Sequence, residues 1–335
     1  MSLTLSRFPG HNAEMRLKMN AFGLVLVSAL TGGALGFEPA AGVKVDHFVP
    51  VAAGVAQVSK DDSGVSLRMA ENAMVVQRGE NRVMVDVWRP DDDRVLPGIL
   101  MIHGGGWIGG SKEAFHPMAE ALARRGWVVV ATSYRLATEA PFPGAVLDVK
   151  ASLRWMRAHA SEWKLDPEKI GAVGGSAGGH LAGMIATTGD HALLEKDGPW
   201  PEFSSRLQAA VLMGAGVDQL QRARESAKPI PSQRIFFEGT VEEKEAVYRE
   251  ASPFHQLTKD CPPLLFMDGE LDTPGQRYIA MRQRMDELGV PQRMVVIGGE
   301  KHGSWGRAPW LESNVVEIDR FLSQYLKAKP SKEAP

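Results

Sequence analysis

The serine whose neighbours best suit nucleophilic chemistry is Ser176. It lies in the stretch Gly174-Gly175-Ser176-Ala177-Gly178, a G-x-S-x-G pattern between an apolar run and a helical pattern. On a sharp strand-to-helix turn the serine hydroxyl is exposed, and the helix N-terminus directs N–H groups and a positive dipole at the reacting atom. Glycines two residues before and after the serine remove side chains that would clash in such a turn. The pattern predicts a nucleophile; the alternative is a structural glycine turn in another α/β fold.

A serine nucleophile needs a general base, and position along the chain favours one histidine. In folds with this type of turn, the chain order is serine, acid, histidine. His302, in GGEKHGSW, directly follows the last apolar run and so lies at the carboxyl edge of the predicted sheet. His103 precedes the serine, and His180 points down the helix away from Ser176, where we expect it to pack. His302 is therefore the predicted base.

Four carboxylates are candidates for the acid that orients this base. Asp268, Glu270 and Asp272 lie in MDGELDTPG after the penultimate apolar run, and Asp218 follows an earlier one. A carboxylate beyond the strand end, in a loop that can reach His302, favours Asp272. Asp268 is expected to accept hydrogen bonds from loop N–H groups.

The glycine-rich loop MIHGGGWIGG (101–110) admits two interpretations. Gly104, Gly106 and Gly109 have the G-x-G-x-x-G spacing of a dinucleotide-binding loop. That fingerprint requires a helix to begin at once and an acidic residue to end the next strand. The helical pattern begins near Lys112, however, and the next strand ends in ATSYR. Arg135 in that segment leaves open an NADP-binding oxidoreductase, because it could meet a 2′-phosphate.

An oxyanion hole is the favoured interpretation of the same loop. A tetrahedral intermediate on Ser176 needs an N–H donor from the next residue, Ala177, and another from a loop after an earlier strand. Glycines suit the second donor because only a backbone without side chains approaches the oxygen closely. His103 and Trp107 are expected to shape the loop and line the substrate pocket.

Strand and helix patterns alternate from about Ala73 onward, which predicts βαβ units and a largely parallel sheet. AMVVQ and NRVMVDVWRP form a predicted hairpin, and PGILMIH, GWVVVATSY and LQAAVLMGA read as buried strands. Residues 217–257 are polar, contain several prolines and lack a buried strand. They predict a small helical excursion over one end of the sheet.

Bulk composition excludes several classes of site. The chain has 335 residues, a formal net charge of −2 and one cysteine, Cys261. A balanced charge gives no electrostatic footprint for nucleic acid or an anionic membrane. A single cysteine excludes intramolecular disulfides and cysteine zinc sites. No cluster of metal ligands stands out, so we predict neither a metal nor an organic cofactor, and nothing indicates an oligomeric state.

The N-terminus has the pattern of a targeting segment. Arg16 and Lys18 precede the short apolar core AFGLVLVSAL, and small residues follow. This favours a signal peptide over 1–36 and a secreted or periplasmic protein, without a membrane anchor. The predicted organisation continues with an N-terminal extension over 37–69, one domain over 70–328 and a disordered tail over 329–335.

Several motifs together resemble those of the α/β-hydrolase esterases. They are HGGGW, SYRL…PFPGAVLDVKASLRWMRAHA, LDPEKIGAVGGSAGGHLAG, EKEAVYREASP, GELDTPG and KHG, in the family's order over about residues 70–327. The chain is similar to the hormone-sensitive-lipase-like branch, and more so to the bacterial feruloyl/acetyl-xylan-esterase-like group. The resemblance implies an α/β-hydrolase fold, with a mostly parallel central sheet and helices on both faces. It also implies a triad of Ser176, Asp272 and His302, and oxyanion donors at Gly105, Gly106 and Ala177.

The implied activity is that of a serine carboxylesterase for short acyl esters of acetyl or feruloyl type, on small molecules or plant polysaccharides. The sequence departs from the family pattern at three places. Asp268 stands where relatives often carry a histidine, Thr273-Pro274-Gly275 lacks the usual apolar-proline pair, and GAGVDQL lacks the usual proline. The last two could alter the acyl and alcohol pockets. Alternatives are an arylformamidase or peptidase-like amide hydrolase with the same triad, and a non-catalytic hydrolase-fold binding protein.

Overall fold

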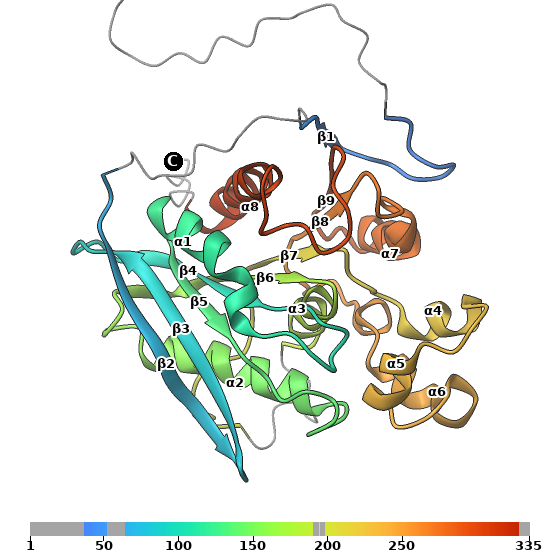
Figure 1. Ribbon diagram of the computed structural model, residues 1–335, viewed down its shortest axis with the longest axis horizontal. Coiled ribbons are helices and arrows are strands. Elements are labelled where there is room, and N and C mark those ends of the chain that lie inside the picture. Colours follow the sequence, from blue (N-terminus) through green and yellow to red (C-terminus); the bar gives the residue numbers. More distant parts are fainter. Residues whose placement is uncertain (1–36, 52–63, 190–193, 195–197, 328–335) are drawn as a thin grey trace, which may run out of the picture. The chain divides into compact units, whose positions relative to one another are not determined.

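The computed structural model describes residues 37–51, 64–189, 194 and 198–327 (Figure 1). The predicted signal peptide and the predicted tail lie outside these residues. No helix in the described part of the chain is long and apolar enough to span a membrane.

A nine-stranded sheet organises the described chain, in the order β1-β9-β8-β7-β6-β4-β5-β3-β2. All neighbouring strands are parallel except the β2–β3 and β3–β5 pairs, which are antiparallel. This confirms the predicted hairpin and the predicted α/β class. The strands are β1 (His47–Val49), β2 (Leu67–Arg78), β3 (Asn81–Pro90), β4 (Leu96–Ile102), β5 (Val128–Thr132), β6 (Leu165–Gly175), β7 (Ala209–Met213), β8 (Leu264–Gly269) and β9 (Gln292–Ile297).

Helices cover both faces of this sheet, as predicted, because its central strands are apolar on both sides (Figure 1). Successive β4 side chains point to opposite faces. Ile99 and Met101 pack with α1 (His116–Arg124) and α8 (Leu311–Leu326). Leu100 and Ile102 pack on the other face, which α2 (Gly144–Ala158), α3 (Ala177–Thr187) and α7 (Ile279–Leu288) cover.

The segment between β7 and β8 is helical, as its polar, proline-punctuated sequence predicts. Its helices α4, α5 and α6 lie together beside α3 (Figure 1). The short helix η3 returns the chain to the sheet, since Phe254 donates its N–H to the carbonyl of Val217. The elements are α4 (Gln219–Glu225), α5 (Pro231–Phe236), α6 (Val241–Glu250) and η3 (Pro253–Gln256).

The expected domain boundary at residue 70 is too late. The described residues from Phe37 onward belong to the same compact unit as the sheet. β1 extends the sheet by pairing with β9, Phe37 stacks on Phe48 at 4.9 Å, and Arg282 on α7 bonds Asp46 at 2.8 Å. A strand of three residues is too short to show an alternation of apolar and polar residues. β1 is therefore identified by its pairing with β9, which lies far away in sequence.

Candidate active site

Ser176 lies at the turn between β6 and α3 in a backbone conformation that few residues adopt. Its φ is 54° and its ψ is −117°, a strained region that tends to occur at functional sites. A Cβ atom at Gly174 would lie 2.1 Å from the carbonyl oxygen of Gly178, and one at Gly178 would lie 2.0 Å from that of Ile102. The turn is therefore too tightly packed for any side chain at these two positions, which is the clash anticipated from the motif.

The structure brings Ser176, His302 and Asp272 into one hydrogen-bonded chain. Nε2 of His302 lies 2.9 Å from Oγ of Ser176, and Nδ1 lies 2.6 Å from Oδ2 of Asp272. Serine, base and acid come from the loops after β6, β9 and β8, three strands whose carboxyl ends meet at one edge of the sheet. With a proton on Nδ1, Nε2 is free to accept the serine proton, the arrangement that general-base catalysis requires.

Arg277 holds the carboxylate that orients the histidine, a role that the sequence did not suggest. Its Nη2 lies 2.9 Å from Oδ1 of Asp272, and its Nη1 donates to the carbonyl of Gly214 at 3.1 Å. Burial raises the pKa of Asp272, but hydrogen bonding to His302 and the charge of Arg277 outweigh it, and the pKa lies below its usual value. Asp272 therefore stays ionised and can stabilise an imidazolium on His302.

The other three candidate carboxylates have structural partners. Asp268 is fully buried and accepts the N–H of Gly275 at 2.8 Å and the hydroxyl of Tyr278 at 3.1 Å. Glu270 accepts an N–H from the loop that carries His302, and Asp218 caps the N-terminus of α4. None of these three has a recorded hydrogen bond to His302 in the described part of the chain.

The glycine-rich loop passes immediately beside the nucleophile. A Cβ atom at Gly104 would lie 2.8 Å from the carbonyl oxygen of Gly175 and 3.3 Å from Cβ of Ser176. Gly106, with a φ of 61°, and Ala177 both line the cavity in front of the serine, whereas Gly105 does not. Ala177 is the first residue of α3, where backbone N–H groups lack a partner within the helix. The loop and the helix start therefore both border the space in front of Ser176.

Trp107 is held in a strained conformation at the cavity wall. It has a φ of 64°, rare for a bulky residue, and stacks on Phe236 of α5 at 4.8 Å. Its Nε1 donates to Nδ1 of His180 at 3.1 Å, and Nε2 of His180 contacts the carbonyl of Ala251 at 2.7 Å. Burial lowers the pKa of His180 to about 4, so the ring is neutral and donates to Ala251. His180 thus packs away from Ser176 and positions Trp107.

His103 does not line the cavity in front of Ser176, so its expected place in the pocket wall is wrong, whereas its expected contact with the glycine-rich loop is present. The cavity of about 810 Å³ reaches Trp107 and Ser176 but not His103. The imidazole is buried, stacks on Tyr134 at 4.3 Å and bonds the Gly104 carbonyl through Nδ1 at 2.8 Å. His103 comes immediately after the buried strand β4, and its side chain turns into the core. From there it contacts the glycine-rich loop through the Gly104 carbonyl.

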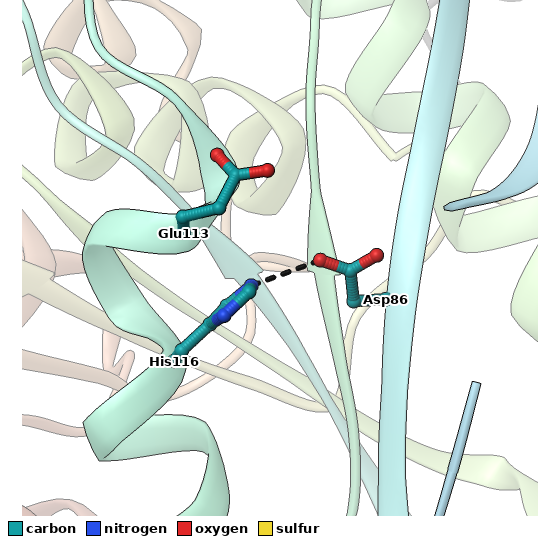
Figure 2. Close-up of side chains that lie close together, drawn as sticks. All are labelled: Asp86, Glu113 and His116. Atoms are coloured by element: carbon teal, nitrogen blue, oxygen red, sulfur yellow. Dashed lines mark hydrogen bonds and ion pairs between the residues drawn. The ribbon is translucent and has the colours of Figure 1, made fainter. Parts of the chain in front are cut away.

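The only group of residues in the described ranges with metal-ligand geometry is Asp86, Glu113 and His116 (Figure 2). His116 Nε2 lies 2.9 Å from Oδ2 of Asp86. The ammonium of Lys112 lies 2.7 Å from the same oxygen and 2.8 Å from Oε1 of Glu113. A cation already sits between the carboxylates, so the cluster is an ion-pair network that anchors the end of the glycine-rich loop to β3.

Arg135, the residue that left an NADP interpretation open, is engaged elsewhere. Its Nε and Nη2 form a bidentate pair with the carboxylate of Asp148, at 2.8 and 2.9 Å. Such a fork-to-fork pair uses the geometry with which arginine would otherwise bind a phosphate.

Glu300, two residues before His302, makes stability depend on pH. Its side chain is buried and accepts a hydrogen bond from Asn314 at 2.7 Å. Burial raises its pKa to about 8, Asn314 opposes the rise, and the charges of Asp268 and Asp272 add to it. An unfolded chain has a glutamate pKa of about 4.3. The folded protein thus holds an extra proton between these values, and the free energy of unfolding should fall as pH rises through that window.

Glu300→Gln is expected to remove this part of the pH dependence, because glutamine is neutral and still accepts from Asn314. Urea unfolding from pH 4 to 8.5 should show similar stability of the variant and the parent at pH 4, below the glutamate pKa of about 4.3 in the unfolded chain. At pH 8 the variant should be more stable, with a difference in slope of up to about 1.4 kcal/mol per pH unit. Parallel curves for the two proteins would show that Glu300 does not titrate with folding.

Comparisons with known proteins place this site in a family context. The BD-FAE family profile matches residues 85–276. The chain is 34% identical over 196 residues to the probable carboxylic ester hydrolase LipM of Mycobacterium tuberculosis. The aligned segment covers 56% of this chain and 45% of LipM. It spans about half the length of the curated mycobacterial relatives LipM, LipC and LipQ.

Solved structures show the same fold over most of the chain. The butyrate-bound esterase Est2 of Thermogutta terrifontis has a TM-score of 0.64 and 26% identity, covering 80% of this chain and 97% of that one. A truncated carbohydrate esterase from gut microbiota has a TM-score of 0.70 and 21% identity, covering 80% and 99%. The expectation of an α/β-hydrolase fold is confirmed.

Proposed function

This chain belongs to the BD-FAE family of α/β-hydrolase esterases, and from that membership we propose that it is a serine carboxylesterase. The observation that carries the proposal is the chain of hydrogen bonds through His302, at 2.9 Å to Ser176 and 2.6 Å to Asp272. The names of the matched proteins support the same activity, since LipM is called a probable carboxylic ester hydrolase and Est2 an esterase.

In the proposed reaction, Nε2 of His302 takes the proton of Ser176 as Oγ attacks the ester carbonyl carbon. The negative charge that develops on the carbonyl oxygen is stabilised by N–H groups of Gly105, Gly106 and Ala177. His302 then protonates the departing alcohol, leaving the acyl group on Oγ. Water attacks this acyl-enzyme with His302 again as base, and the acid and free Ser176 are released. Asp272 holds the imidazole and balances its transient charge.

The proposed substrates are short acyl esters of acetyl or feruloyl type, on small molecules or plant polysaccharides. The names of two structural neighbours support this choice, since one is a carbohydrate esterase and the other is an esterase solved with butyrate bound. The cavity of about 810 Å³ lies open beside Ser176 and has room for a bulky group in addition to a short acyl chain.

A substrate panel tests this function. It comprises acetylated xylan, methyl ferulate, p-nitrophenyl esters from acetate to decanoate, and two amides, N-formylkynurenine and acetanilide. We expect release of acetate or ferulate and a decline in kcat/KM along the p-nitrophenyl series. Higher activity on the amides than on every ester would favour the amide hydrolase alternative. No turnover of any member would favour the non-catalytic binding protein.

We further propose that the protein is exported, on the basis of the targeting pattern around Arg16, Lys18 and residues 21–30. Expression in the native host and fractionation should place the protein in the periplasm or the medium, with a new N-terminus near residue 36. A full-length chain in the cytosol would contradict export without affecting the proposed chemistry.

A further inference from the structure

A positive charge without a partner lines the cavity in front of Ser176. Arg222 belongs to α4, in the excursion between β7 and β8, and it lines the same cavity as Ser176, Trp107 and His302. Its side chain has no recorded hydrogen bond or ion pair with any residue of the described chain, and it remains exposed to solvent. Its backbone N–H alone is engaged, in the first turn of the helix.

The other charged groups around this cavity are already engaged. Arg277 holds Asp272, which in turn holds His302. The two acids nearest in sequence to Arg222 are Asp218, which caps α4, and Glu225, its last residue, and both bond other partners. Asp218 accepts the N–H of Gln221 at 2.9 Å, and Glu225 accepts from the side chain of Gln221 at 2.7 Å. Among the described residues neither acid forms an ion pair with Arg222, although both lie within helical reach of it in sequence.

Gly216 leaves space for this guanidinium. A Cβ atom at Gly216 would lie 3.1 Å from Nη1 of Arg222 and 2.8 Å from Nε2 of Gln219. An arginine remains charged, so two guanidinium groups line the cavity, and of these Arg277 forms an ion pair with a carboxylate, that of Asp272.

We propose that Arg222 is a specificity-determining residue that binds a carboxylate group on the ester substrate. This inference rests on the proposed esterase function and narrows it to esters that carry a negative charge. A guanidinium presents a planar pair of N–H donors that match a carboxylate, and charge-assisted bonds of this type are about twice as strong as neutral ones. The carboxylate can belong to the acyl part or to the alcohol part of the ester, and the two are distinguished by experiment.

The test compares charged and neutral esters in two arms. In the acyl arm, p-nitrophenyl hemiadipate is compared with p-nitrophenyl hexanoate, after subtraction of spontaneous hydrolysis. In the alcohol arm, 4-acetoxybenzoate is compared with 4-acetoxybenzamide. We expect Arg222→Gln to lower kcat/KM for the charged ester of one arm by about 10- to 100-fold. The neutral esters should change by less than about twofold, and Arg222→Lys should retain part of the preference.

Arg224→Gln is the matched control, because Arg224 lies on the same helix but pairs with Glu245 at 2.7 Å and does not line the cavity. It should leave both arms unchanged. Raising the salt concentration should reduce the preference of the parent for the charged ester, since an ionic contact in an open cavity is screened.

Two outcomes would overturn the inference while leaving the esterase function intact. One is an equal loss on charged and neutral esters in Arg222→Gln, which would indicate a purely structural role. The other is unchanged kcat/KM for all four esters in that variant. A different result would contradict the proposed esterase function itself: no hydrolysis by the parent protein of any of the four esters or of any member of the substrate panel. The inference about Arg222 would then fail with it.

Discussion

Replacing Ser176 with alanine is expected to lower kcat for p-nitrophenyl acetate by about 10⁵- to 10⁶-fold. The estimate follows losses seen when the nucleophile of a serine-histidine-acid triad is removed, because the remaining groups then have no atom to acylate. The hydroxyl of Ser176 is the only group bonded to Nε2 of His302 in the described structure. Steady-state rates with purified protein measure the effect, with a burst of p-nitrophenol in the parent as evidence for an acyl-enzyme.

Covalent labelling provides an independent test of the same residue. A fluorophosphonate should add one label to the parent protein, on the peptide that contains Ser176, and none to Ser176→Ala. Ser232→Ala is the matched control, since Ser232 lines the same cavity but has no recorded bond to a histidine. It should still be labelled. Labelling of Ser176→Ala at full yield would show that another residue is the nucleophile.

Replacing Asp272 with asparagine should lower kcat by about 10⁴-fold with little change in KM. In the parent, Nδ1 of His302 lies 2.6 Å from Oδ2 of Asp272. Asparagine keeps the shape of this side chain but removes its charge, and if its amide nitrogen faces Nδ1 it offers a donor in place of an acceptor. The imidazole would then favour the wrong tautomer and lose its counter-charge. Arg277, which now bonds Oδ1 of Asp272 at 2.9 Å, would be left with a neutral partner. Steady-state kinetics across pH 5–9 measure the loss.

Asp268→Asn separates this role from general damage to the loop. Asp268 lies four residues earlier, and burial raises its pKa to about 7, with the charge of Arg277 opposing the rise. Asparagine resembles the protonated form and can still accept the N–H of Gly275. We expect kcat within about tenfold of the parent, because no member of the triad loses a bond. Comparable losses in both variants would contradict the assignment of Asp272 as the orienting acid.

The nucleophile turn and the order of the triad could be predicted from local sequence. Ser176 lies between an apolar strand and a helix, with Gly174 and Gly178 two residues before and after it. Gly174 is required by its contact with Gly178, and Gly178 by its contact with Ile102 of β4. His302 and Asp272 could be selected because both lie in loops that follow apolar runs, and parallel strands present their carboxyl ends at one edge. The serine motif and the apolar runs are each only a few residues long, so they can be recognised without knowledge of the tertiary fold.

His103 shows where the same reasoning fails. Its position before three glycines suggested a pocket wall, but the side chain stacks on Tyr134 in the core. A residue at a strand end can turn to either side, and only the packing of β5 and its following loop determines which. The strand β1 illustrates a related limit, since three residues near position 48 acquire their structure only by pairing with β9.

The sequence by itself determined the α/β class, the serine turn and the residues that could act as base and acid, because periodicity and glycine spacing are local properties of the chain. The tertiary structure decided the rest. It placed Asp272 2.6 Å from Nδ1 of His302, brought Arg277 against Asp272, and left Arg222 in the cavity without an ion pair among the described residues. These contacts join residues from separate loops, and hydrogen bonds and charges act over a few ångströms in space, whatever their separation along the chain.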